Sequence, residues 1–151
     1  MGSSIRENDG ILSEATRRIH DFNKAFGHPS YDGDLPVKLD DNRKMARASW
    51  MREEIQEFLD ARTIAEEVDA LVDCLYFVIG TAVEMNVDLS EPFEMVHNAN
   101  MQKLFPDGKP HYNQDNKVIK PEGWVAPDEK IRDYIDSLVL KNVDKLKVLE
   151  G

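Results

Sequence analysis

The stretch REEIQEF at residues 52–58, followed after a short spacer by EEVDALVD at residues 66–73, decides the fold. Its acidic residues recur three or four positions apart, which is the repeat of an α-helix. At about 100° per residue, Glu54 and Glu57 lie about 60° apart and border the apolar stripe that includes Ile55. The two stretches therefore predict two consecutive helices, each of which directs carboxylates toward the interior.

The second stretch continues into an almost wholly apolar run, residues 70–83, which is interrupted only by Asp73 and Thr81. A helix that is apolar nearly all round is expected to be buried, and Asp73 with it. A buried ionised carboxylate is costly unless a positive group pairs with it, and that group could be Arg43, Arg47 or a metal ion. Because several carboxylates converge here, one basic side chain could not balance the charge. Mg²⁺ could, since it takes hard oxygen ligands and leaves positions for water and phosphate.

Each acidic feature also has a simpler explanation when it is taken alone. The carboxylates of Glu53, Glu54 and Glu57 could form a solvated helix face. Glu66 could serve only as the partner of Thr63 in a capping box at the start of its helix. The combination of two short acidic clusters on consecutive helices is what favours a metal site.

Composition excludes several classes of protein. The chain has 151 residues, 41% of them hydrophobic, which suits one domain with a true core. Its net charge of −10 argues against binding to nucleic acid or to an anionic membrane. A single cysteine, Cys74, excludes an intramolecular disulfide and a cysteine-cluster metal site. No apolar run could span a bilayer and no signal-peptide core is seen, so we expect a soluble, cytoplasmic protein.

The remaining pattern predicts helices throughout and no strands, so the predicted class is all-α, in a single domain over residues 1–151. Residues 105–127 hold four prolines and two glycines and are expected to form a long ordered loop or flap. The helix over 63–84 is apolar on nearly every side, which predicts a homodimer or a homotetramer. Around a loose N-terminus at 1–9, the expected helices span residues 11–26, 41–61, 63–84, 90–103 and 128–150.

The acidic stretches resemble the signature of the MazG-like, all-α nucleotide pyrophosphohydrolases: Glu-Glu-x-x-Glu on one helix and Glu-x-x-Asp on the next. Downstream, VHNANMQKL at 96–104, DGKP at 107–110 and NKVIK at 116–120 resemble the branch in which a fourth helix and a lysine-bearing loop complete the nucleotide site. The spacer between the acidic stretches is short, and in this the chain resembles the compact dUTPase-related or phosphoribosyl-ATP pyrophosphohydrolase-like branch. The resemblance covers about residues 22–128 and implies a four-helix-bundle core with an extra C-terminal helix.

This resemblance implies metal-dependent hydrolysis of a nucleoside triphosphate to the monophosphate and pyrophosphate. The favoured substrate is dUTP or another deoxy or non-standard nucleotide, as in a housecleaning enzyme, and the favoured cofactor is Mg²⁺, with Mn²⁺ as the alternative. Glu53 and Glu54 would be the catalytic carboxylates, with Glu53 acting as a ligand or as the base that activates water. Asp73, one turn further along, would be an additional ligand or would support the ligands. The implied metal ligands are Glu54, Glu57, Glu66 and Asp69.

Residues after position 100 supply candidates for substrate binding. Phosphate oxygens need cationic donors, although each downstream lysine could equally be an ordinary solvated side chain. The family pattern favours Asn100 for contact with the base or sugar, and Trp124, in a loop, is the better candidate for stacking on a base. Trp50, Tyr76 and Phe77 could also stack on a base, but the core is the favoured place for all three. The candidate phosphate-binding residues are Lys103, Lys109, Lys117 and Lys120.

A competing hypothesis keeps the same helices but assigns them no chemistry. In this alternative the chain is a non-catalytic acidic helical module that binds a partner protein. The two hypotheses differ in their response to metal, because only the enzyme gains thermal stability from Mg²⁺ and nucleotide.

Overall fold

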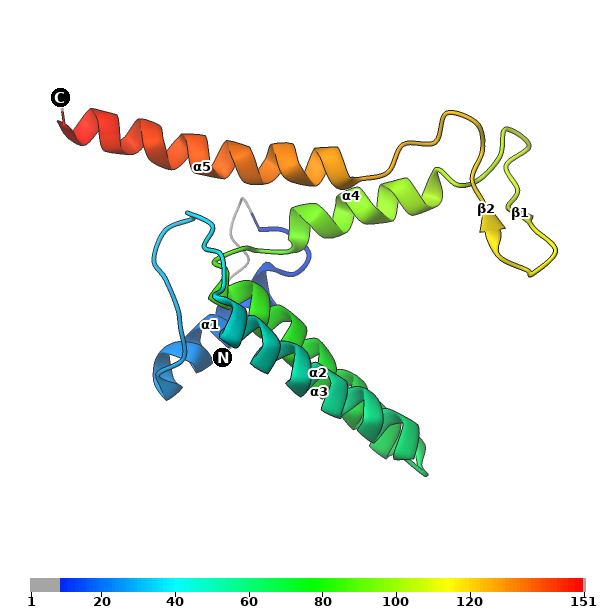
Figure 1. Ribbon diagram of the computed structural model, residues 1–151, viewed down its shortest axis with the longest axis horizontal. Coiled ribbons are helices and arrows are strands. Elements are labelled where there is room, and N and C mark those ends of the chain that lie inside the picture. Colours follow the sequence, from blue (N-terminus) through cyan, green and yellow to red (C-terminus); the bar gives the residue numbers. More distant parts are fainter. Residues whose placement is uncertain (1–8, 151) are drawn as a thin grey trace. The chain divides into compact units, whose positions relative to one another are not determined.

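The structure is a computed structural model that describes residues 9–150, with side chains up to residue 145. The predicted loose segment at 1–9 therefore lies almost wholly outside the described residues. The all-α prediction is confirmed, and every helix boundary lies within two residues of its expected position. The elements are α1 (Ser13–Phe26), α2 (Asp41–Asp60), α3 (Ile64–Glu84), α4 (Ser90–Met101), β1 (His111–Tyr112), β2 (Val118–Ile119) and α5 (Asp128–Glu150) (Figure 1).

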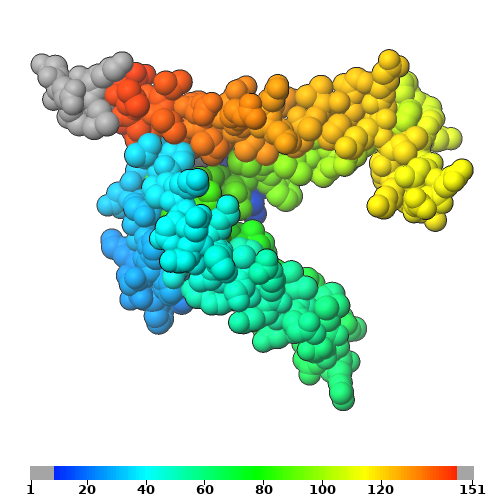
Figure 2. Space-filling model, viewed as in Figure 1, coloured from blue at the N-terminus to red at the C-terminus, as the bar shows by residue number. Residues whose placement is uncertain are grey.

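The chain divides into two compact units, residues 1–89 and residues 90–151, and each is described by itself. In the first unit, α2 and α3 form a helical hairpin, and α1 packs against α3. The core of this unit forms around Ile19 of α1 with Ile79 and Val83 of α3. Figure 2 shows α1 at one end of the hairpin, whereas the end that carries the turn at residues 61–63 extends away from it. The expectation of one domain over the whole chain stays a prediction.

Local signals in the sequence set the limits of α3. Thr63 caps the helix, because its Oγ1 accepts a hydrogen bond from the backbone N–H of Glu66 at 3.1 Å. The predicted Thr63 cap is therefore confirmed. The Glu66 carboxylate accepts from the N–H of Arg62 at 2.8 Å, one residue before the N-cap, and not from Thr63 as in a regular capping box. Beyond the other end, Asn86 adopts a φ of 57°, the left-handed conformation in which Asn is tolerated after a helix.

In the single chain, α3 is buried on one face only. Its inner face is buried at Ala70, Ile79 and Val83. Its outer face is not, because Leu71 and Leu75 are 55% and 53% exposed. Within this unit α3 packs against two helices, which cover only part of its apolar circumference.

In the second unit, α4 contacts α5, and the segment between them is ordered by a small hairpin. Strands β1 and β2 pair antiparallel, with His111 opposite Ile119, so the prediction that the chain has no strands is wrong here. Phe105 stacks on the His111 ring with 3.8 Å between centroids, and Asp107 accepts from His111 at 2.9 Å. Each strand is only two residues long, too short for the alternation of polar and apolar residues to be recognised. Across the described residues, the helices are too short or too polar to cross a membrane.

Candidate active site

Three carboxylates meet between the two long helices of the first unit. Glu54 and Glu57 come from α2 and Asp73 from α3, and one oxygen of each lies within 4.8 Å of the other two. Like charges at this separation repel one another strongly. The arrangement is stable when the groups share protons or when a cation lies among them, and carboxylate oxygens are the ligands that Mg²⁺ prefers.

Glu54 is the most perturbed member of this carboxylate cluster. Its Oε2 is buried without a hydrogen-bond partner, which is a costly state for a carboxylate oxygen. Burial, then a hydrogen bond with Glu57 and the charges of Glu57, Asp73 and Asp69, raise the pKa of Glu54 to about 7. Burial and the charges of Asp69 and Glu57 also raise the pKa of Asp73. The cluster thus lacks positive charge of its own and fits a divalent cation.

The other predicted ligands lie next to this cluster. A hollow of about 260 Å³ at the turn end of the hairpin is lined by Glu57, Asp60, Ala61, Glu66 and Asp69. Glu57 therefore belongs to both groups, whereas Glu66 and Asp69 belong to the hollow alone. Asp73, expected as an additional ligand or as a support for the ligands, is a member of the cluster, whereas Asp69, an implied ligand, is not. Glu53 is exposed on α2 and is not part of the cluster.

The two arginines considered as partners of Asp73 bind another carboxylate. Arg43 donates to the fully buried Glu84 from Nε at 2.6 Å and from Nη2 at 3.0 Å. Arg47 forms a second ion pair with Glu84. The hypothesis that an arginine neutralises Asp73 is therefore wrong. Glu84 was missed in the sequence, although a charged residue at the end of an apolar helical run is itself a signal.

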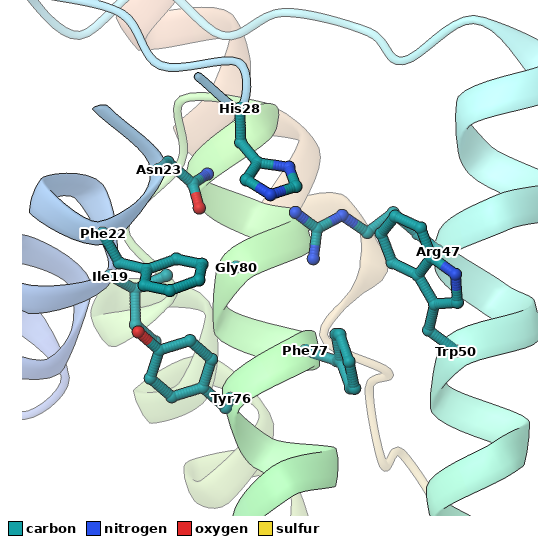
Figure 3. Close-up of a pocket in the computed structure, with 9 residues that line it drawn as sticks. All are labelled: Ile19, Phe22, Asn23, His28, Arg47, Trp50, Tyr76, Phe77 and Gly80. Atoms are coloured by element: carbon teal, nitrogen blue, oxygen red, sulfur yellow. The ribbon is translucent and has the colours of Figure 1, made fainter. Parts of the chain in front are cut away.

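A cavity of about 300 Å³ opens among α1, α2 and α3 (Figure 3). Along α2 and α3 it lies about one helical turn from the carboxylate cluster. Trp50 lies four residues before Glu54 on α2, and Phe77 lies four residues after Asp73 on α3, a step of about 6 Å along each helix. Trp50, Tyr76 and Phe77 were expected in the core, but they line this cavity. The lining residues are Ile19, Phe22, Asn23, His28, Arg47, Trp50, Tyr76, Phe77 and Gly80.

The second unit brings together several of the predicted substrate-binding residues. Lys103 donates from Nζ to Oδ1 of Asn100 at 2.9 Å. Trp124 donates from its indole N–H to the carbonyl of Ala99 at 2.7 Å. The ammonium groups of Lys103 and Lys120 lie 5.4 and 4.6 Å from the centroid of the Trp124 ring, within cation–π range. The remaining predicted lysines, Lys109 and Lys117, are exposed on the hairpin segment.

Helices that present facing carboxylates beside an apolar cavity are typical of all-α, metal-dependent nucleotide hydrolases. The phosphoribosyl-ATP pyrophosphohydrolase family model matches residues 19–100, more than half of the chain, and this range includes the whole carboxylate cluster. The chain belongs to this family, within the MazG-like NTP pyrophosphohydrolases, and it is a hydrolase of that family. The family is metal-dependent and acts on nucleotides, in keeping with the acidic cluster.

Two further comparisons add little to this assignment. No curated protein matches the chain. A crystal structure from Exiguobacterium sp. 255-15, described as a candidate NTP pyrophosphohydrolase, is 26% identical, covering 85% of this chain and 95% of that one. Its TM-score of 0.42 is too low to establish a common arrangement of the helices.

Proposed function

We propose that this protein is a Mg²⁺-dependent nucleoside triphosphate pyrophosphohydrolase that releases a monophosphate and pyrophosphate. The proposed substrate is dUTP or another deoxy or non-standard nucleotide, whose removal would cleanse the nucleotide pool. The observation that carries the proposal is the cluster of Glu54, Glu57 and Asp73, with its unpartnered buried oxygen, one turn from a cavity with aromatic walls.

In this proposal the cluster holds the ion through Glu54, Glu57 and Asp73. When bound, Mg²⁺ neutralises charge on the phosphates and lowers the pKa of a coordinated water. Glu66 and Asp69, in the adjoining hollow, are the proposed further ligands. Glu53 lies outside the cluster, and its proposed role, to accept the proton from the attacking water, rests on the family pattern alone.

The cavity is the proposed site of the base. Its aromatic side chains Trp50, Tyr76 and Phe77 offer stacking surfaces, and its one-turn offset from the cluster suits a base linked through a sugar to the phosphates. A triphosphate carries about four negative charges and the chain carries −10, so cations must mediate binding. The proposed donors to the phosphates are Lys103, Lys109, Lys117 and Lys120, and Asn100 and Trp124 are proposed to contact the nucleoside.

The proposed assembly is a homodimer or a homotetramer. Val68, Leu71, Val72 and Leu75 on α3 are each more than half exposed, as is Ile64 at its start. A contiguous apolar surface of this kind is uncommon on a monomer and is typical of an interface.

The test is a panel of ribo- and deoxynucleoside triphosphates incubated with the purified protein and Mg²⁺ or Mn²⁺, with pyrophosphate and phosphate measured separately. We expect pyrophosphate from at least one deoxynucleotide, and loss of turnover in Glu54→Gln with an unchanged helical CD spectrum. Asp21→Asn, an exposed α1 carboxylate outside the cluster, is the matched control. If no nucleotide yields pyrophosphate and Mg²⁺ does not change thermal stability, the acidic interaction module is the better description.

A further inference from the structure

A buried ion pair joins the two helices that carry the carboxylate cluster. Glu84, the last residue of α3, is fully buried and binds both Arg43 and Arg47 of α2. Within α2, all of whose residues the structure describes, Arg47 is the only one that is buried. The hydrophobic core of this unit consists of residues from α1 and α3. The fully buried attachment of α2 to α3 is therefore ionic.

Gly80 allows Arg47 to lie directly against α3. The Arg47 side chain extends from α2 toward α3 at the level of Gly80 (Figure 3). A Cβ added at Gly80 would come within 3.2 Å of Nη1 of Arg47, so the missing side chain leaves room for the guanidinium. The buried charge is thus placed at one level of α3, where Glu84 pairs with it.

Contacts at three successive levels between α2 and α3 agree on one register. They are Arg43 with Glu84, Trp50 with Phe77, whose ring centroids are 5.9 Å apart, and Glu54 with Asp73. The first two contacts are separated by seven residues on both helices, and the last two by four residues on both. Because every α-helix rises by about 1.5 Å per residue, a single antiparallel register satisfies all three contacts.

The carboxylate cluster does not favour this register by itself, since its like charges repel one another. A shift of α3 by four residues, about 6 Å, would bring Asp69 to the level of Asp73 and Gly80 to the level of Glu84. The buried guanidinium of Arg47 would then face a residue without a carboxylate, which is a costly state. The ion pair of Glu84 therefore excludes the shifted register.

We propose that Glu84 is a positioning residue that sets the register of α3 against α2 and thereby brings Asp73 to the carboxylates of α2. This inference rests on the proposed function, since the site it positions is the proposed metal site. Glu84 lies eleven residues from Asp73, about 16 Å along α3, so it acts without touching the ion. A divalent cation binds tightly at the cluster only while this ion pair is present.

The test uses a variant that removes the ion pair without leaving a buried charge. Arg47→Met combined with Glu84→Leu replaces both charges by apolar side chains, an exchange that is often neutral or stabilising. Arg43 keeps an acceptor in this paired apolar variant, because its Nη2 donates to Nδ1 of His28 at 3.0 Å. We therefore expect the variant to keep its helical CD spectrum.

Calorimetric titration with Mn²⁺ alone measures the effect on the cluster. We expect the Kd for Mn²⁺ to rise by at least about tenfold in the paired apolar variant. The matched control is Arg17→Met combined with Asp9→Leu, which removes an ion pair that involves neither α2 nor α3 and should change the Kd by less than about twofold. In the wild type, Asp73→Asn should weaken Mn²⁺ binding at least about tenfold more than Asp69→Asn, whereas in the paired apolar variant the two effects should lie within about threefold of each other.

Spin labels measure the register directly and without metal. Cysteines that replace the exposed Lys44 on α2 and Ala65 on α3, with Cys74→Ser, would carry the labels, and excess unlabelled protein would remove distances between chains. Dipolar spectroscopy should give one distance with the native ion pair. In the paired apolar variant we expect a second distance that is shorter by about 6 Å, because a shift by one turn moves Ala65 toward Lys44.

If the paired apolar variant does not fold, Glu84→Gln, which keeps the shape and removes the charge, takes its place with the same expected changes. An unchanged label distance overturns the inference, and so does an unchanged Kd for Mn²⁺ in a variant that has lost the ion pair. A shifted label distance in a protein whose wild type binds no Mn²⁺ supports the role of Glu84 in the register and overturns the proposal of a Mg²⁺-dependent enzyme instead.

Discussion

Replacing Asp73 with Asn tests the carboxylate cluster directly, because the amide keeps the shape of the side chain and removes one negative charge. Without metal, the variant should be more stable than the wild type. Two unit charges 4.8 Å apart repel by about 1 kcal/mol in water and by about 3.5 kcal/mol at an effective dielectric constant of 20. Since Asp73 is only partly buried, we expect a gain near the lower figure, which is a rise in Tm of about 2–4 °C.

With Mg²⁺ the effect of the same substitution should reverse. A metal concentration of 100 times Kd stabilises the wild type by about 2.7 kcal/mol, and a variant that binds about a hundredfold more weakly keeps only about 0.4 kcal/mol. The measurement is thermal unfolding followed by CD, in EDTA and in MgCl₂, together with the rate of pyrophosphate release. We expect the Tm of Asp73→Asn to lie above that of the wild type in EDTA and below it in MgCl₂, and we expect the variant to lose turnover.

Asp69→Asn and Asp21→Asn complete this experiment. Asp69 is a ligand that the family pattern implies. Asp21 is an exposed carboxylate on α1, and its substitution should change neither the Mg²⁺ response of the Tm nor the rate of turnover. If Asp73→Asn keeps the full Mg²⁺ response and full turnover while Asp69→Asn loses both, the reasoning from the cluster is refuted. The ligand set would then be the one that the family pattern implies.

Three further predictions concern other features of the first unit. In EDTA, the free energy of unfolding should fall as pH rises from about 4.5 through 7, because the folded protein retains a proton on Glu54 that the unfolded chain releases. Thermal unfolding followed by CD across this pH range should show the fall. In Glu54→Gln the stability should depend less on pH over the same range. Glu84→Leu leaves the buried guanidinium of Arg47 and the half-buried guanidinium of Arg43 without their carboxylate. It should cost about 3–5 kcal/mol in urea unfolding, so a loss below about 1 kcal/mol would contradict this network. Leu75→Glu should reduce the mass measured by light scattering to that of a monomer, and an unchanged mass would exclude the outer face of α3 as the interface.

The helices could be predicted because their signals are local. Thr63 begins α3 through a hydrogen bond to a residue three positions away, and Asn86 ends it with its own backbone conformation. The burial of α3 could not be predicted in the same way. The apolar residues around α3 indicate that its surface is covered, but they do not indicate whether the same chain or a second chain covers it.

The residues of the carboxylate cluster could be named from the sequence, whereas their role as a site stays a prediction. The interruption of the apolar run identified Asp73, and the spacing on α2 identified Glu54 and Glu57. Whether Asp69 or Asp73 faces Glu54 and Glu57 depends on the packing register of α3 against α2. The sequence of either helix alone does not determine that register. The pairing of Arg43 with Glu84 joins residues 41 positions apart, and no periodicity within one element could reveal it.

The two tryptophans give each unit its own fluorophore. Trp50 lies in the cavity wall, with the guanidinium carbons of Arg43 and Arg47 each 5.1 Å from its ring centroid. Trp124, in the second unit, has the ammonium groups of Lys103 and Lys120 within cation–π range of its ring. In Trp124→Phe, the remaining emission would come only from the indole beside the cavity. Quenching or a spectral shift of this emission during titration with a nucleotide would report binding in the cavity directly, without a label and without turnover.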